Sequence, residues 1–178
     1  MRLAGVLLAS LLAQAAPVVP RAPFVATPPD VVDRMLLLAK VDSRDVVYDL
    51  GCGDGRIVIA AAQKFGARGI GVDIDPVRIA EANANAQRAG VEKLVTFKLQ
   101  DVLETDVSDA TVVMLYMLSA INVKLRPILT RELPKGSRIV SHNFAMGDWE
   151  PDHVETFKDA AGTTRTLYLW TTDGTIRP

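Results

Sequence analysis

The sequence predicts an α/β fold: a doubly wound, mostly parallel sheet that finishes in an antiparallel hairpin. Short apolar runs alternate with longer segments whose apolar residues recur at helical spacing. This alternation is typical of parallel strands joined by right-handed crossover helices. Three glycines at alternate positions, Gly51, Gly53 and Gly55, follow the first apolar run. Near the end, two segments alternate polar and apolar residues, which indicates paired strands and not another helix.

Local signals bound each element. Prolines at 28 and 29 suit the first turn of a helix, and Asp75-Pro76 supplies a cap and a first helical position for a later one,. Pro127 is expected to bend its helix or to mark its start. In order, we expect a helix from residue 27, a strand over 45–50, a helix over 55–65, a strand over 70–74, a helix over 75–90, strands over 94–99 and 111–118, a helix over 122–133, a strand over 136–142, and a hairpin of 154–158 with 164–172.

Composition favours one domain and excludes several kinds of site. The chain has 178 residues, 49% of them hydrophobic, which is enough for a substantial core,. Its formal net charge is -1 and it has no basic stretch, so no nucleic-acid partner is expected,. Cys52 is the only cysteine and is interpreted as a small side chain in a crowded turn,. With only His142 and His153 and no paired cysteines, no metal site is expected,. His142 is interpreted as a structural residue at a strand end.

Acidic residues end the first three predicted strands. These residues are Asp49, Asp73 and Asp101. In a doubly wound sheet the ligand lies at the carboxyl ends of the strands, and an acid about 20 residues after the glycine turn is where ribose hydroxyls bind. Alone, each acid could be a solvated loop carboxylate or a helix cap, and Asp75 is better explained as a cap. Three together, beside a glycine turn, indicate a nucleotide-like ligand.

The spacing of the glycines narrows the class of ligand that the turn could bind. Dinucleotide sites usually read G-x-G-x-x-G, whereas this chain reads G-x-G-x-G after Asp49 and carries Arg56 where the third glycine would stand,. A nicotinamide dehydrogenase would also need a separate substrate domain, for which this chain has no room. The pattern resembles the S-adenosylmethionine (SAM) loop of class I methyltransferases, whose sheet is Rossmann-like. That resemblance implies SAM as the cofactor, held by Thr27, Asp49, Gly51, Gly53, Gly55, Asp73, Ile74, Asp101 and Val102. Asp49 would face the methionine ammonium, Asp73 the ribose, Ile74 the adenine face and Asp101 the adenine amino group.

Three segments extend the resemblance to a subgroup. Residues 23–28 (PFVATP), 48–56 (YDLGCGDGR) and 141–149 (SHNFAMGDW) are similar to the small seven-strand protein-lysine methyltransferases of archaea, bacteria and mitochondria. The order of parts is also similar to that of the non-SET histone-lysine methyltransferase. The resemblance implies a protein substrate that bears lysine. Asn143 departs from the family pattern, in which an acid often stands at that position.

Lysine methylation requires an unprotonated amine, although free lysine has a pKa near 10.4. An apolar channel with aromatic walls favours the neutral amine. The residues expected to form or approach such a channel are Tyr116, Phe144 and Trp149, with Phe24 as a further candidate wall. The alternative for Tyr116 is a half-buried core position, and for Phe144 and Trp149 it is packing under the C-terminal hairpin.

Other functions remain open from the sequence. Exocyclic-amine DNA methyltransferases carry Asn or Asp-Pro-Pro-aromatic after the fourth strand, where this chain reads Leu-Tyr-Met-Leu-Ser. A small-molecule N- or O-methyltransferase is an alternative. A SAM-binding module without catalysis is another.

The N-terminus has the layout of a signal peptide or a membrane anchor. A positive start at Arg2 precedes an apolar run over 3–13, and residues 13–15 fit a small-x-small cleavage pattern,. We therefore expect a leader and linker over 1–22, a methyltransferase domain over 23–178, and membrane association through 3–13 or export. Because SAM is made in the cytosol, a cytoplasmic protein with an over-called start codon is the alternative.

Overall fold

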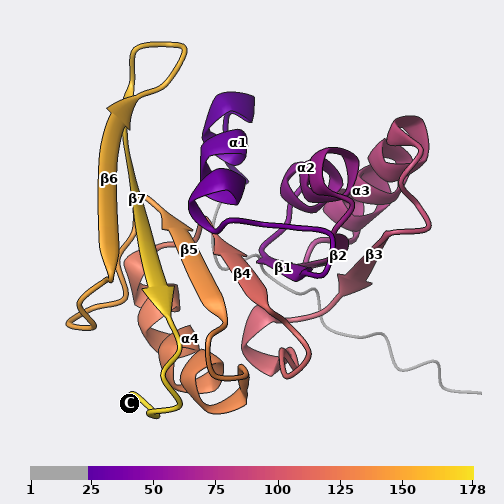
Figure 1. Cartoon of the computed structure of the whole chain (residues 1–178). Helices are drawn as coiled ribbons and strands as arrows, with labels where there is room; N and C mark the ends of the chain where they lie inside the picture. The colour runs from indigo at the N-terminus through magenta and orange to yellow at the C-terminus, as the bar shows by residue number, and fades with distance from the viewer. Residues whose placement is uncertain (1–23) are drawn as a thin grey trace, which may run out of the picture.

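The computed structural model describes residues 24–178 and shows one seven-stranded sheet with helices on both faces (Figure 1). The leader and linker predicted over 1–22 lie outside the described residues. Within 24–178, no helix combines the length and apolarity needed to cross a bilayer. The elements are α1 (Pro29–Leu38), β1 (Val46–Leu50), α2 (Arg56–Phe65), β2 (Arg68–Asp73), α3 (Pro76–Ala89), β3 (Val95–Leu99), η1 (Val102–Glu104), β4 (Val112–Leu115), α4 (Ser119–Glu132), β5 (Arg138–His142), β6 (His153–Lys158) and β7 (Thr164–Thr171).

The strand order confirms the predicted fold class. The sheet runs β3-β2-β1-β4-β5-β7-β6. The first five strands in the chain are parallel, and β7 is antiparallel to both β5 and β6. From β1 the chain winds outward to one edge and then returns to wind toward the other. The point of reversal lies between β1 and β4, where the carboxyl ends of the strands form a ligand crevice in this class of fold.

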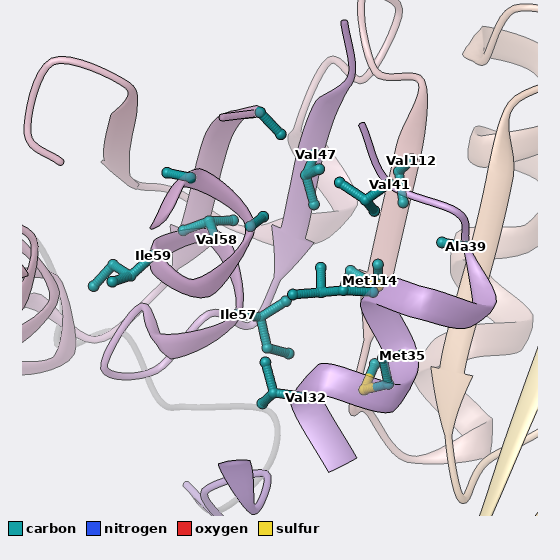
Figure 2. Packing of buried hydrophobic residues seen from close by; sticks show 14 of the residues in the cluster. Val32, Met35, Ala39, Val41, Val47, Ile57, Val58, Ile59, Val112 and Met114 are labelled. Atoms are coloured by element: carbon teal, nitrogen blue, oxygen red, sulfur yellow. The ribbon is translucent and has the colours of Figure 1, made fainter. Parts of the chain in front are cut away.

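The first face of the sheet is covered by α1, α2 and α3. Val32 and Met35 from α1 and Ile57 and Val58 from α2 belong to one buried cluster that also contains Val47 of β1 (Figure 2). The residues on either side of the glycine turn are therefore anchored in one buried cluster. Burial of these apolar side chains, worth about 1.5–3 kcal/mol for each large one, fixes where α2 begins relative to the end of β1.

The second face is covered by α4. Leu125 and Leu129 of α4 join a buried cluster with Tyr48, Leu115 and Trp170 from the strands. Neighbouring residues of β1 thus face opposite layers, as the pleat of a strand requires. All five β1 residues are buried, which is the pattern expected of a strand covered on both sides,.

Some predicted boundaries are wrong in an informative way. The fourth strand ends at Leu115 and not at residue 118, because Leu118 occupies the cap position of α4 and its carbonyl accepts from the amides of Ile121 and Asn122 at 2.8 and 3.1 Å. As a result, α4 begins before the predicted start at 122, and Pro127 lies inside it and not at its beginning. The short helix η1 was not anticipated at all.

Candidate cofactor and acceptor site

The three glycines form a tight turn between β1 and α2. Their φ angles are +86° at Gly51, +52° at Gly53 and +79° at Gly55, a region that glycine enters without steric cost. The amides of Gly51 and Cys52 both donate to the carbonyl oxygen of Val72 on β2, at 2.8 and 2.9 Å. The turn is therefore tied to the neighbouring strand, and its conformation requires glycine.

Side chains on this turn would also meet their surroundings. A Cβ on Gly51 would lie 2.6 Å from the sulfur of Met117, and one on Gly53 would overlap the Phe24 ring. The turn therefore has no room for a side chain at either position, and the backbone at Gly51 forms part of the cavity wall at the ends of the strands. A ligand can approach it closely there.

A cavity opens beside this turn at the carboxyl ends of the parallel strands. Most of the predicted cofactor and acceptor residues line it, although they come from separate parts of the chain: Thr27, Asp49, Gly51, Asp73, Ile74, Asp101, Val102 and Tyr116. Gly53 and Gly55 belong to the adjoining turn and are not among the lining residues. The topology therefore brings the predicted strand-end acids to one place.

Asp49 is the most buried acid of the cavity, with 2% of its surface exposed. Burial raises its pKa to about 8, and the negative charges of Asp73 and Asp54 add to the shift. A carboxyl group in this position favours its proton until a cation approaches. The end of β1 is thus prepared for a positively charged ligand group.

Asp73 anchors the turn as well as lining the cavity. One of its carboxylate oxygens accepts from the Gly53 amide at 2.9 Å, and the other accepts from the Asp75 amide at 3.0 Å. Each carboxylate oxygen has a second lone pair, so the group can still accept from ligand hydroxyls. Asp75 caps α3 by accepting from the Val77 amide at 2.8 Å, which confirms its interpretation as a cap.

Asp101 is a helix cap that also lines the cavity. It caps η1, where its side chain accepts from the Leu103 amide at 3.0 Å, and it also lines the cavity next to Val102. The cap holds the start of η1 against the cavity. The amide end of this short helix is therefore part of the wall that follows β3.

The N-terminal strap, residues 24–27, closes one side of the cavity. Arg56 holds it: its guanidinium donates to the Thr27 carbonyl at 2.8 Å and forms a fork with Asp54 at 2.9 and 2.5 Å. Burial alone would raise the pKa of Asp54, but its hydrogen bonds and ion pair with Arg56 outweigh burial and lower it. The Phe24 ring lies 4.8 Å from the Arg78 guanidinium. Two arginines thus connect the strap to the rest of the site.

Aromatic side chains gather where β4 and β5 end. Tyr116, directly after β4, lines the cavity. The His142 ring, at the end of β5, stacks on it with 3.9 Å between centroids and 26° between planes. The Phe144 ring is tilted, 6.0 Å away, and is not itself among the lining residues. Tyr116 is therefore the aromatic residue of this group that meets the cavity directly.

His142 is fully buried, and neither ring nitrogen has a hydrogen-bond partner among residues 24–178. Burial lowers its pKa to about 4; the positive charge of Arg165 lowers it further, while Asp159 opposes the shift. The imidazole is therefore neutral at physiological pH and has no contact with solvent. This agrees with a structural residue and argues against a general base.

Trp149 does not line the cavity. Its ring lies 5.8 Å from that of Trp170, and its carbonyl accepts from the Trp170 indole at 2.9 Å. The Arg177 guanidinium stands 4.6 Å from the Trp149 ring. These contacts agree with the alternative considered for Trp149 from the sequence, which is packing under the C-terminal hairpin.

Comparison with known families agrees with this geometry. A family model described as the ANTKMT methyltransferase domain matches residues 49–153, more than half of the chain and from the acid of β1 onward. The chain belongs to this family. It is a SAM-dependent methyltransferase, and the cavity fits that cofactor: a bare glycine turn, the buried Asp49 for a cationic group, and Asp73 with free lone pairs for hydroxyls.

Individual relatives differ in the acceptor that their names give. A protein-lysine N-methyltransferase of Saccharolobus islandicus is 44% identical over 85% of this chain and 94% of its own length. The adenine nucleotide translocase lysine N-methyltransferase of Mus musculus is 32% identical over 72% of this chain, which spans only 56% of that protein. A crystal structure described as an RNA methyltransferase from Salinibacter ruber with S-adenosyl-L-homocysteine is 53% identical, with a TM-score of 0.80 over 86% of this chain and 97% of its own.

The methyltransferase site includes residues that the sequence analysis did not assign. They belong to the strap, to the glycine turn and the start of α2, to α3, and to the segment after β4: Val25, Ala26, Asp54, Arg56, Ile57, Arg78 and Met117. Asp54 and Arg56 stand inside the glycine motif itself, so their position was a usable signal. Arg78 was not detectable, because only the fold brings it to the Phe24 ring. Among residues 24–178, no cluster of His, Cys, Asp or Glu is suited to hold a metal ion.

Proposed function

We propose that this methyltransferase transfers the methyl group of SAM to the side-chain amine of lysine in a protein. The observation that carries the proposal is the 44% identity to a protein-lysine N-methyltransferase across 94% of that protein. The aromatic end of the cavity at Tyr116 supports it, since an apolar wall favours the neutral, nucleophilic amine.

The residues divide between cofactor and acceptor in this proposal. SAM supplies an electrophilic methyl group on its sulfonium. Asp49 would balance the cofactor's ammonium, Asp73 would accept from its ribose hydroxyls, and Asp101 would accept from its adenine amino group. Thr27, Ile74 and Val102 would enclose it. Tyr116 would align the amine with the methyl group, and orientation of this kind contributes a large part of a transfer rate.

Labelled methyl transfer tests the proposal. The purified chain is incubated with methyl-labelled SAM and with separate protein, RNA and small-molecule fractions of a cell lysate, and labelled sites are found by mass spectrometry. Gly53→Arg serves as the matched inactive control, because its side chain would occupy the turn. Methyl-lysine that depends on the intact turn supports the proposal. Label confined to small molecules would remove it and favour the small-molecule alternative, whereas SAM binding with no transfer would favour a non-catalytic module.

RNA is the second candidate acceptor, and one observation favours it: the 53% identical structure is described as an RNA methyltransferase. The electrostatics of this chain favour protein instead. Its formal net charge is -1, and RNA binding normally depends on a positively charged surface that neutralises phosphates. Ribonuclease-sensitive label in the assay above would reverse the order of the two candidates.

We also propose that the apolar run over 3–13 associates the chain with a membrane or directs its export,. The support is the sequence pattern alone. Expression of the full chain, followed by cell fractionation and mass measurement of the mature N-terminus, tests it. An intact N-terminus found only in the soluble cytosolic fraction would contradict it.

A further inference from the structure

The loop that follows β5, residues 143–149, is held at both ends by neighbouring elements. Asn143 has a φ of +64° and pairs with Thr166 of β7: its amide donates to the Thr166 carbonyl at 2.7 Å, and its side-chain oxygen accepts from the Thr166 amide at 2.9 Å. Toward the far end, Arg126 of α4 donates to the Met146 carbonyl at 3.2 Å and pairs with Asp148 at 2.5 Å. Phe144 lies between these two anchors.

The Phe144 carbonyl accepts two hydrogen bonds. One comes from the Ser141 hydroxyl at 2.6 Å, and the other comes from the side-chain amide of Asn122 on α4 at 3.0 Å. The same amide nitrogen donates to the Ser141 hydroxyl at 3.1 Å, and both side chains are fully buried. With both of its lone pairs used, the carbonyl fixes the orientation of this peptide and places the Phe144 ring 6.0 Å from that of Tyr116.

Stability alone does not account for an asparagine at position 122. Its side-chain oxygen is buried and has no hydrogen-bond partner among residues 24–178, and such an atom lowers stability. Reversing the amide would not repair this, because the Asn122 side-chain oxygen would then face the Phe144 carbonyl oxygen, which is also an acceptor,. A leucine of similar size would remove both the unpaired oxygen and the two donated bonds.

We propose that Asn122 is a positioning residue for methyl transfer. By holding the Phe144 carbonyl, Asn122 sets the Phe144 ring against Tyr116 at the acceptor end of the cavity. Arg126, about one turn further along α4, holds the same loop at Met146. Asn122 is not among the residues that line the cavity. The inference rests on the proposed function only in taking the Tyr116 end of the cavity as the place where the acceptor enters.

Asn122→Leu tests the proposal, with Thr130→Val as the matched control. Thr130 lies on the same helix and is buried, but its hydroxyl donates to the Arg126 carbonyl at 2.8 Å and accepts from the Arg177 amide at 2.9 Å, and it forms no hydrogen bond with the Phe144 carbonyl. Asn122→Leu should lower kcat by about tenfold or more while the SAM dissociation constant changes by less than about twofold, because a small displacement near the reacting groups affects alignment and not cofactor binding. Thr130→Val should leave both quantities near those of wild type.

A double-mutant cycle with Phe144→Leu tests the path of the effect. If Asn122 acts through Phe144, the two losses in kcat are not additive, and Asn122→Leu adds little to Phe144→Leu. Full additivity, or an unchanged kcat in Asn122→Leu, overturns the proposal. Should Asn122→Leu fail to fold, Asn122→Ala removes the same two donated bonds without adding new atoms to the core, and an unchanged kcat in that variant overturns the proposal equally.

A failure of the role proposed for Asn122 can be distinguished from a failure of the proposed lysine methylation. All variants are compared on whichever acceptor the wild-type protein labels. If the wild type labels RNA or a small molecule, the lysine assignment falls, while the ratio of kcat between Asn122→Leu and wild type still decides the role of Asn122.

Discussion

The His142 imidazole lies flat against the Tyr116 ring, with 3.9 Å between the two centroids. The cavity is on the other side of this pair, since Tyr116 lines it and His142 has no exposed surface. A buried residue at the end of β5 therefore supports the aromatic residue that follows β4. The position of Tyr116 depends on the shape of its neighbour and not on a hydrogen bond from it.

The first prediction concerns that shape. His142→Ala should leave a void behind Tyr116 and lower the free energy of unfolding by about 2–4 kcal/mol, with a fall in kcat. His142→Phe keeps a flat ring and should retain most of the activity. Chemical denaturation and labelled methyl transfer measure the two effects. If His142→Phe were as inactive as His142→Ala, a chemical role for the imidazole would replace the packing role.

The second prediction follows from the lowered pKa of His142. In the unfolded chain its pKa is about 6.5, and in the folded protein it is about 4. Between these values the unfolded state binds the proton and the folded state does not, so stability is present above about pH 6.5 and falls as pH decreases toward 4. The loss should reach about 3 kcal/mol. Denaturation across this range measures it, and His142→Phe should flatten the curve; an equally steep curve in that variant would assign the loss to other groups.

The third prediction concerns Asp49, whose pKa is raised to about 8 in the absence of ligand. A bound cation would favour its ionised form, so SAM binding should release a proton below about pH 8. SAM affinity should therefore increase as pH rises toward 8, by at most about tenfold for each pH unit. Calorimetry in buffers of different ionisation enthalpy counts the protons. In Asp49→Asn this proton release should disappear, and its persistence would assign the proton to another group.

The fourth prediction separates backbone strain from collision at the glycine turn. Gly53 has a φ of +52°, and a Cβ there would overlap the Phe24 ring; Gly90 has a φ of +68° with nothing within 4 Å. Gly53→Ala and Gly90→Ala should both lose about 1 kcal/mol of stability to strain. Only Gly53→Ala should also weaken SAM binding. Thermal unfolding and calorimetry measure the pair, and equal SAM affinities would mean that the turn does not contact the cofactor.

The fifth prediction concerns the strap. Arg56→Lys keeps the charge, but a single ammonium cannot form the fork with Asp54 and also hold the Thr27 carbonyl,. We expect SAM to dissociate about tenfold faster, the equivalent of about 1.4 kcal/mol. Arg44→Lys, which alters an exposed ion pair with Asp42, is the control and should have no effect. Equal dissociation rates in stopped-flow measurements would show that the strap does not retain the cofactor.

The features that were predicted correctly are mostly those that a short stretch of sequence determines. The glycine turn and the Asp75 cap are determined within a few residues, so they can be recognised without the fold. The boundaries of β4 and α4 depended on Leu118, which can end a strand or cap a helix. Leu118 itself is exposed. The start of α4 instead depends on where Leu125 and Leu129 pack against the second face of the sheet, which no local pattern contains.

The sequence by itself determined the order of strands and helices, the cofactor turn and the acids at the strand ends. It could do so because parallel strands joined by crossover helices bring their carboxyl ends to one edge, whatever the details of packing. Only the tertiary structure decided which of the candidate aromatic residues meet the cavity. Phe24 and Tyr116 line it, whereas Trp149 packs on Trp170 of β7. That division depends on where the hairpin lies against the sheet, and thus on contacts between residues far apart in the chain.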